Sequence, residues 1–185
     1  MDEVYIKRVI KGDIEAFRYI IREYQHMAFT VAMSVVKDEF IAEDIAQEAF
    51  IKAFENIKKF RFQSKFSTWL YRIVVNLSFK QLKKLKLREG DFISSGTEST
   101  ETAPDGFDKM NETDRKYYIN EALRLLSPNE SLALRLFYLD ENSLVEVGNI
   151  TGWSASNVKV ILHRARKNFY AALHKVLKNE MKTIL

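Results

Sequence analysis

The stretch from Ser143 to Ser154 reads SLVEVGNITGWS and is the most informative part of this 185-residue chain. A short amphipathic segment ends at Gly152, which can supply the positive φ of a tight turn, and Ser154 or Ser156 then offers an N-cap for a second helix. Gly148 leaves room for a partner helix to cross closely. This order predicts a helix-turn-helix, whose second helix enters the DNA major groove. A plain helical hairpin with a solvated face is the alternative.

The segment after Ser154 has the two faces that a DNA-reading helix needs. At 100° per residue, the apolar residues share one arc, predicted to face the core: Val158, Ile161, Leu162, Ala165 and Phe169. The opposite side is polar and cationic, with Ser156, Lys159, Val160, His163, Arg164, Arg166 and Lys167. Arg and Lys pair with guanine edges or phosphates, and a valine can contact a thymine methyl.

Charge divides the chain into three parts. Residues 1–90 carry 17 Lys/Arg and 12 Asp/Glu, residues 91–113 carry 1 and 6, and residues 114–185 carry 11 and 7. Residues 89–113 also hold three of the six glycines and few apolar residues, a composition typical of a flexible linker. We therefore expect two basic helical domains, 1–88 and 114–185, joined by an acidic linker, 89–113. Two positive regions favour a polyanion as partner.

Composition excludes several classes of protein. Glycine (6) and proline (2) are scarce, which favours an all-α fold, and the absence of cysteine excludes disulfides, thiolate metal sites and a cysteine nucleophile. His26, His163 and His174 have neither metal-ligand spacing nor catalytic partners, so we expect no metal, no cofactor and no catalysis. No apolar run is long enough to span a bilayer and no secretory signal is recognisable, so a cytoplasmic protein without membrane insertion is expected.

The first part of the chain predicts at least three helices, because Asp13 to Glu89 contains no glycine or proline. Apolar residues recur at helical spacing from Phe17 to Val35, with Asp13 as N-cap, then from Ile41 to Ala53, and again from Ser67 onward. In the second part we expect a helix over 117–126 and another opened by Ser127 and Pro128.

Two adjoining stretches of the first part differ in character. Residues 39–55 hold five acids and one base, and Asp44 and Glu48 share one helix face, which a basic partner surface explains better than solvent alone. Residues 56–88 hold ten Lys/Arg and no acid, interleaved with aromatic rings, as in binders of unpaired nucleic acid. Trp69, Arg72, Asn76, Lys80 and Lys83 fall within an arc of about 80°.

An ordered set of short motifs resembles bacterial RNA polymerase sigma factors of the extracytoplasmic-function (ECF) class. The motifs similar to region two of that family are Gly12-Asp13, Ala16-Phe17, Ala42-Glu43-Asp44, Gln47-Glu48-Ala49-Phe50, Phe60, Phe66, Thr68 to Ile73 and Asn76. The motifs similar to region four are Leu126-Ser127-Pro128, Arg135, Glu146-Val147, Val158-Lys159 and His163 to Arg166.

The resemblance implies a role for each matched position. Asp44, Gln47 and Glu48 would bind core RNA polymerase. The melted minus-ten element of promoter DNA would contact Phe60, Arg61, Lys65, Phe66, Trp69, Arg72, Asn76, Lys80 and Lys83, with Asn76 lining the pocket for a flipped base. The minus-thirty-five element would contact Ser156, Asn157, Lys159, Val160, His163, Arg164 and Lys167. The resemblance also implies an anti-sigma factor as a partner.

Some positions depart from the family pattern. Glu146-Val147-Gly148 replaces the usual Glu-Ile-Ala, Leu126-Ser127-Pro128 replaces Leu-Pro, and Val160 and Ile161 stand where polar or basic residues are frequent. Three other functions stay open at this point. A helix-turn-helix regulator that acts independently of polymerase would dimerise on palindromic sites. Such a regulator would have no evident use for the acidic stretch 39–55. An enzyme is the second alternative, but the sequence offers no candidate catalytic residues. An adaptor that opposes polymerase is the third, but it would not need two DNA-binding surfaces.

Overall fold

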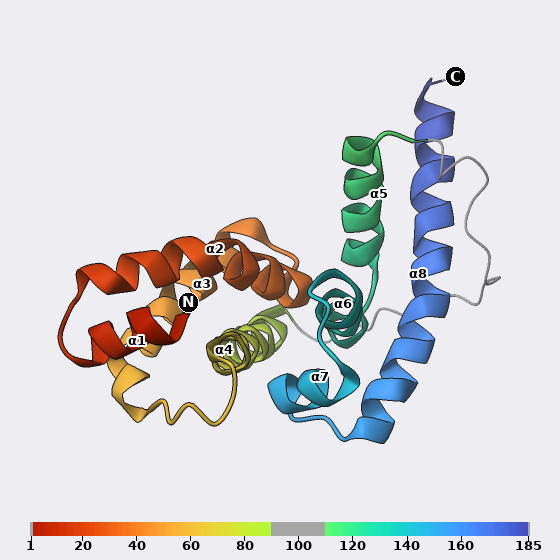
Figure 1. Ribbon diagram of the computed structural model, residues 1–185. Helices are drawn as coiled ribbons and strands as arrows, with labels where there is room; N and C mark the ends of the chain where they lie inside the picture. Colours follow the sequence, from red (N-terminus) through yellow and green to blue (C-terminus); the bar gives the residue numbers. More distant parts are fainter. Residues whose placement is uncertain (1, 90–109, 185) are drawn as a thin grey trace.

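The structure, a computed structural model, describes residues 2–89 and 110–184, and its secondary structure there is entirely helical (Figure 1). The expected all-α class is confirmed. In chain order the elements are α1 (Asp2–Ile10), α2 (Glu15–Val36), α3 (Glu39–Asn56), the 3₁₀ turn η1 (Ile57–Lys59), α4 (Phe66–Glu89), α5 (Glu112–Leu125), α6 (Pro128–Leu134), the π-helical turn η3 (Arg135–Leu139), α7 (Leu144–Thr151) and α8 (Ala155–Ile184).

The first four helices form one bundle around α2. Helices α1, α3 and α4 all pack against α2, and α3 also packs against α4. Ile20, Ala28, Val31 and Val35 of α2 are completely buried, as the helical spacing of these residues predicts. Asp13 does serve the start of α2, since its Oδ1 accepts a hydrogen bond from the Ala16 N–H at 3.2 Å. Helix α1 is an addition that the sequence analysis did not predict.

Helices α5 to α8 form a second group along the length of α8 (Figure 1). The predicted start at Ser127-Pro128 is correct, and the Glu130 carboxylate accepts hydrogen bonds from the Ser127 N–H and hydroxyl at 3.2 and 2.6 Å. Helix α7 begins with a capping box in which Glu146 accepts from the Ser143 N–H at 2.9 Å.

The helix-turn-helix is present as α7, a turn at Gly152 and α8. Gly152 has φ 78° and its N–H donates to the Gly148 carbonyl at 2.8 Å, so the predicted positive φ is confirmed. Ser154, rather than Ser156, caps α8 by accepting from the Asn157 N–H at 3.3 Å. Gly148 was expected to lie under a crossing helix, but the nearest neighbour of a Cβ there would be the backbone carbonyl oxygen of Trp153 at 3.0 Å, so the tight space is in the turn that leads to α8.

The two groups of helices contact each other, which the sequence analysis did not predict. Helix α4 packs against α7, and α2 packs against α6 and η3 (Figure 1). Residues 90–109, most of the expected linker 89–113, lie outside the described residues, and α5 already begins at Glu112. Within the ranges that the structure describes, no helix is long and apolar enough to cross a membrane.

Candidate nucleic-acid and polymerase interfaces

The first turns of α8 present a polar face to solvent. Of the residues predicted to read duplex DNA, six are exposed and Lys167 is half-buried; the exposed ones are Ser156, Asn157, Lys159, Val160, His163 and Arg164. On the opposite side Val158, Leu162 and Ala165 are buried against the rest of the second group. The predicted division of this helix is therefore present. The face combines hydrogen-bond donors and cations with one apolar side chain, Val160, which is 47% exposed.

Helix α4 presents the second cationic face. Arg72, Asn76, Lys80 and Lys83 are exposed, and Trp69 at the same edge is half-buried. The preceding loop contributes two more exposed cations, Arg61 and Lys65. The Lys65 ammonium forms an ion pair with Glu146 of α7, in which Nζ lies 2.8 Å from Oε1.

Phe60 and Phe66 do not present ring faces to solvent, although both were predicted to contact DNA. They are buried, 7% and 4% exposed, and form a ring cluster with Trp69, with centroids 5.4 and 5.5 Å from that of Trp69. Apolar rings with this much neighbouring surface are most stable in the core, so they support Trp69 from behind.

Phe62 is the exposed ring of this loop and was not among the predicted site residues. Its ring is 41% exposed, lies 4.9 Å from that of Phe60, and has the Lys7 ammonium 5.7 Å above it. Its φ of 57° is unusual for a residue with a side chain, so the loop holds this ring outward at a conformational cost. No sequence pattern indicates a positive φ at a phenylalanine.

A pocket of about 400 Å³ lies between the end of α3 and the first half of α4. Trp69 and Asn76 line it together with Lys52, Asn56, Lys59 and Lys80. Asn56 and Lys59 are joined by a hydrogen bond of 2.9 Å from Lys59 Nζ to Asn56 Oδ1. The predicted base-binding position Asn76 thus has an aromatic neighbour and three cations around one hollow. Sequence reasoning missed Lys52, Asn56 and Lys59 because α3 and the η1 turn after it meet α4 only in the fold.

The predicted polymerase-binding residues, the acidic face of α3, are all exposed: Asp44, Gln47 and Glu48. Asp44 and Glu48 line a hollow of about 200 Å³ with Lys80 and Lys84 of α4, whereas Gln47 lines a groove toward α2.

Two exposed apolar side chains lie on either side of the acidic face, Phe40 at 81% and Ile51 at 59% exposure. Sequence reasoning missed both, although their helical spacing from Asp44 and Gln47 is readable. Exposed apolar residues beside charges are typical of protein-binding surfaces.

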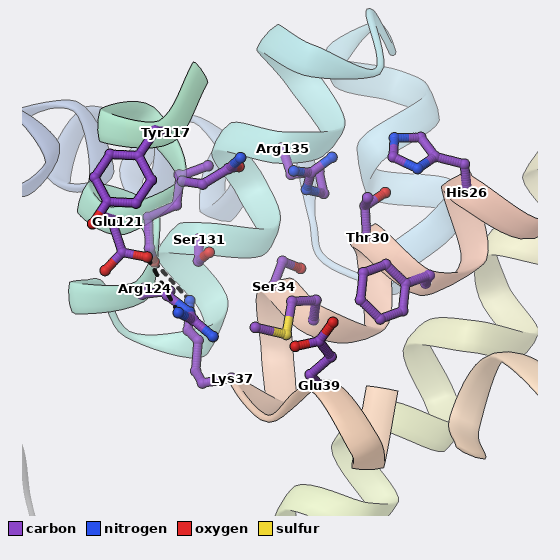
Figure 2. Close-up of a pocket in the computed structure, with 14 residues that line it drawn as sticks. His26, Thr30, Ser34, Lys37, Glu39, Tyr117, Glu121, Arg124, Ser131 and Arg135 are labelled. Carbon is purple, nitrogen blue, oxygen red and sulfur yellow. Dashed lines mark hydrogen bonds and ion pairs between the residues drawn. The ribbon is translucent and has the colours of Figure 1, made fainter. Parts of the chain in front are cut away.

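Polar groups are concentrated where the two groups of helices meet. A cavity of about 380 Å³ lies there, lined by α2 on one side and by α5, α6 and η3 on the other (Figure 2). Lys37, just after α2, reaches across it, and its Nζ donates to the carbonyl oxygen of Leu123 at 2.7 Å. Burial lowers the pKa of Lys37 to about 7, and the nearby Arg135 and Arg124 add to this effect.

The same contact holds an ion pair and a tyrosine. Arg135 and Asp140, each 13% exposed, are 3.8 Å apart, and burial raises the pKa of Asp140 despite Arg135. Tyr71 of α4 is buried beside Asp140, and burial raises its pKa. At the edge, the Lys65 ammonium and the Ser143 N–H lower the pKa of Glu146 to about 2. In the part of the chain that the structure describes, no group of His, Asp and Glu could hold a metal ion.

Comparison with known proteins agrees with this arrangement. Residues 20–88 match the family Sigma-70 region 2, and residues 122–170 match Sigma-70, region 4. The chain is 35% identical over 182 residues to the ECF RNA polymerase sigma factor SigW of Bacillus subtilis, covering 94% of this chain and 95% of that protein. It is 30% identical over 174 residues to the ECF RNA polymerase sigma-E factor of Escherichia coli K12, with 90% and 91% covered.

A solved structure shares the fold: the sigma factor RpoE of Bartonella quintana in complex with the anti-sigma factor NepR. It has a TM-score of 0.67 at 22% identity, with 87% of this chain and 98% of that chain covered. Sigma-70 proteins bind core RNA polymerase and promoter DNA, and they are initiation factors rather than enzymes. Full-length similarity to such factors and the two regions in the expected order place the chain in the sigma-70 family of RNA polymerase sigma factors, within its ECF class.

Proposed function

We propose that the chain directs promoter-specific initiation by recognising two DNA elements with two different surfaces. The exposed face of α8 reads the minus-thirty-five element as duplex, through Ser156, Asn157, Lys159, Val160, His163, Arg164 and Lys167. The cationic face of α4 and its pocket hold melted strand at the minus-ten element. The observation that carries the proposal is that one chain exposes both a helix-turn-helix reading face and an aromatic, cationic pocket.

The minus-ten surface suits unpaired bases. Trp69 and Phe62 offer rings for stacking, which is worth about 1–3 kcal/mol per base, while Arg61, Arg72 and Lys83 lie exposed to follow phosphates. Asn76 supplies an amide for hydrogen bonds at the edge of a flipped base. Phe60 and Phe66 contribute by supporting Trp69.

The remaining roles concern the chain's partners. The acidic face of α3, with Phe40 and Ile51 beside it, docks on a basic surface of core polymerase. An anti-sigma factor binds the chain when transcription is not required, and the protein acts in the cytoplasm, where polymerase works. The domain 1–88 carries polymerase docking and promoter melting, and the domain 114–185 carries duplex recognition.

Transcription reconstituted with purified core RNA polymerase tests the proposal. Adding the chain should start transcripts at a defined set of genomic promoters. Asn76→Ala should change the preferred base within the minus-ten element and leave affinity for core polymerase unchanged. An equal loss at all promoter variants contradicts the pocket assignment. A chain that binds palindromic duplex as a dimer and ignores polymerase is instead a conventional regulator.

As a separate test of docking, the variant Asp44→Lys/Glu48→Lys should lose affinity for core polymerase. It keeps the α8 face intact, so binding to an isolated minus-thirty-five duplex should persist. Full polymerase affinity in this variant contradicts the docking assignment.

A further inference from the structure

We propose that the cavity between α2 and the second group of helices is a binding site for a small organic phosphate. None of the residues predicted to bind DNA or polymerase lines this cavity, so the site adds a ligand to the proposed function rather than another contact with promoter or polymerase. Its volume of about 380 Å³ lies within the range of small-molecule pockets in proteins. The proposal follows from the polar groups that line the cavity (Figure 2).

The wall formed by α6 holds a hydroxyl group without a partner. Ser131 is completely buried, and among the described residues its Oγ has no hydrogen-bond partner. A buried hydroxyl in this state lowers stability, and such groups call for a ligand or an ordered water as their partner. Because Ser131 lines the cavity, an oxygen of a bound ligand can accept a hydrogen bond from it.

Two cationic side chains with unused donors line the same cavity. Arg135 follows Ser131 by four residues, which places both on one face of the helix. Its ion pair with Asp140 is 3.8 Å long, longer than a hydrogen bond, so guanidinium N–H donors remain available. Lys37 comes from the end of α2 and uses one of its N–H donors on the Leu123 carbonyl at 2.7 Å.

The acidic side chains at the cavity do not neutralise these two cations. Glu121 is already paired with Arg124 at 3.2 Å, and Glu39 is exposed, so water weakens its field. The charges that act most on Lys37 are the like charges of Arg135 and Arg124, which together with burial lower its pKa. A bound phosphate would replace this repulsion by attraction and favour the charged amine. The electrostatics of the cavity therefore favour an anion.

The remaining lining residues indicate what the anion is attached to. Guanidinium, ammonium and hydroxyl donors are typical of phosphate sites. Phe29, Met33 and Tyr117 add apolar surface, which suits an aromatic or aliphatic body. A ligand held by Lys37 from one group and by Arg135 from the other binds while the groups are in contact, so its concentration would adjust the stability of that contact.

Titration of the full chain with phenyl phosphate, followed by ¹H–¹⁵N NMR, tests the site. We expect saturable shifts at the backbone amides of Lys37, Leu123, Ser131 and Arg135. Benzoate carries less negative charge and should bind at least about tenfold more weakly. The DNA-binding faces of α4 and α8 are also cationic, so shifts confined to those faces overturn the proposal. Equal affinity for benzoate overturns the assignment to phosphate.

Two variants test the assigned groups. Lys37→Met should weaken binding of phenyl phosphate at least about tenfold, and Ser131→Ala about fivefold. Neither should disrupt the cavity, because Ser131→Ala removes a hydroxyl that has no partner and methionine has about the length of lysine. Lys11→Met is the matched control, since it removes the same charge from an exposed position outside the cavity and should bind like the unaltered chain.

Unchanged affinity in both cavity variants overturns the proposal. The titration uses the free chain without polymerase or promoter, so its failure leaves the proposed function in initiation intact. Conversely, failure of the transcription assay does not affect the ligand site.

Discussion

Replacing Lys37 by methionine is expected to stabilise the contact between the two groups of helices, although it removes a hydrogen bond across that contact. The Lys37 amine donates to the Leu123 carbonyl at 2.7 Å, but the structure gives it no carboxylate partner among the described residues. Burial lowers its pKa from the ordinary 10.5 to about 7, so forming this contact at pH 8 requires the amine to lose a proton.

The size of the effect follows from the free energy of removing this proton. Removing it from an exposed lysine at pH 8 costs about 1.4 kcal/mol for each pH unit below 10.5, or roughly 3 kcal/mol. Methionine avoids that cost but leaves the Leu123 carbonyl without a donor, a loss of about 1–3 kcal/mol. The net gain for the contact between the two groups is about 1 kcal/mol, which corresponds to roughly a fivefold shift in the equilibrium between groups in contact and groups apart.

Lys37→Arg is the matched variant, because arginine keeps its proton at any accessible pH. Both replacement side chains are unbranched at Cβ, so both adopt the positive φ of 61° at position 37 at a similar conformational cost. The chain has no cysteine, so a fluorophore pair on Lys11→Cys and Lys175→Cys, two exposed positions in the first and the second group, can report the urea concentration that separates the two groups in half of the chains. We expect this concentration to rise for Lys37→Met and to fall for Lys37→Arg. A shift of both variants in the same direction refutes the reasoning.

The remaining predictions concern pH, DNA sequence and stability. The pKa of Lys37 is lower when the two groups of helices are in contact, so the state with this contact binds fewer protons. The share of chains in this state should therefore rise between pH 7 and 10.5 and stay level below pH 7. Fluorescence of the labelled chain measures this share, and Lys37→Met should abolish the slope. Val160 should contact a thymine methyl, so replacing that thymine by deoxyuridine in a selected minus-thirty-five duplex should weaken holoenzyme binding about threefold, whereas Val160→Ala should be indifferent to the exchange. Gly152→Ala should lower the free energy of unfolding by about 1 kcal/mol in urea titrations, because φ 78° strains any residue with a Cβ, and Gly152→Asn should cost less.

The elements of the fold were largely readable from the sequence, because each depends on local chemistry. The helical spacing of apolar residues located α2, and the serine-proline pair located the start of α6. Gly152 and Ser154 located the turn before α8 because a positive φ and an N-cap have their own residue preferences. Helix α1 was missed because its nine residues bury only Ile6 and Val9, too short a pattern to stand out.

Most of what was missed in the candidate site depends on contacts between distant parts of the chain. Lys52 and Asn56 join Trp69 at one pocket only because α3 packs against α4. Phe60 and Phe66 were assigned to DNA because aromatic residues among cations suit unpaired bases, but the same rings also suit a core, and burial decided between the two. Spacing along one helix cannot distinguish these cases, since both place the ring on a defined face.

The contact between the two groups of helices includes charged side chains, unlike the buried face of α2. Within the first group the buried residues of α2 are mostly aliphatic, and exposing them to water is costly. Between the groups lie Lys37, Arg135 and Asp140, which regain water when the contact separates. Two further buried atoms there, Ser131 Oγ and Asp140 Oδ2, have no hydrogen-bond partner among the described residues. Each such atom lowers the stability of the contact between the two groups by about 1–3 kcal/mol relative to the same atom with a hydrogen-bond partner.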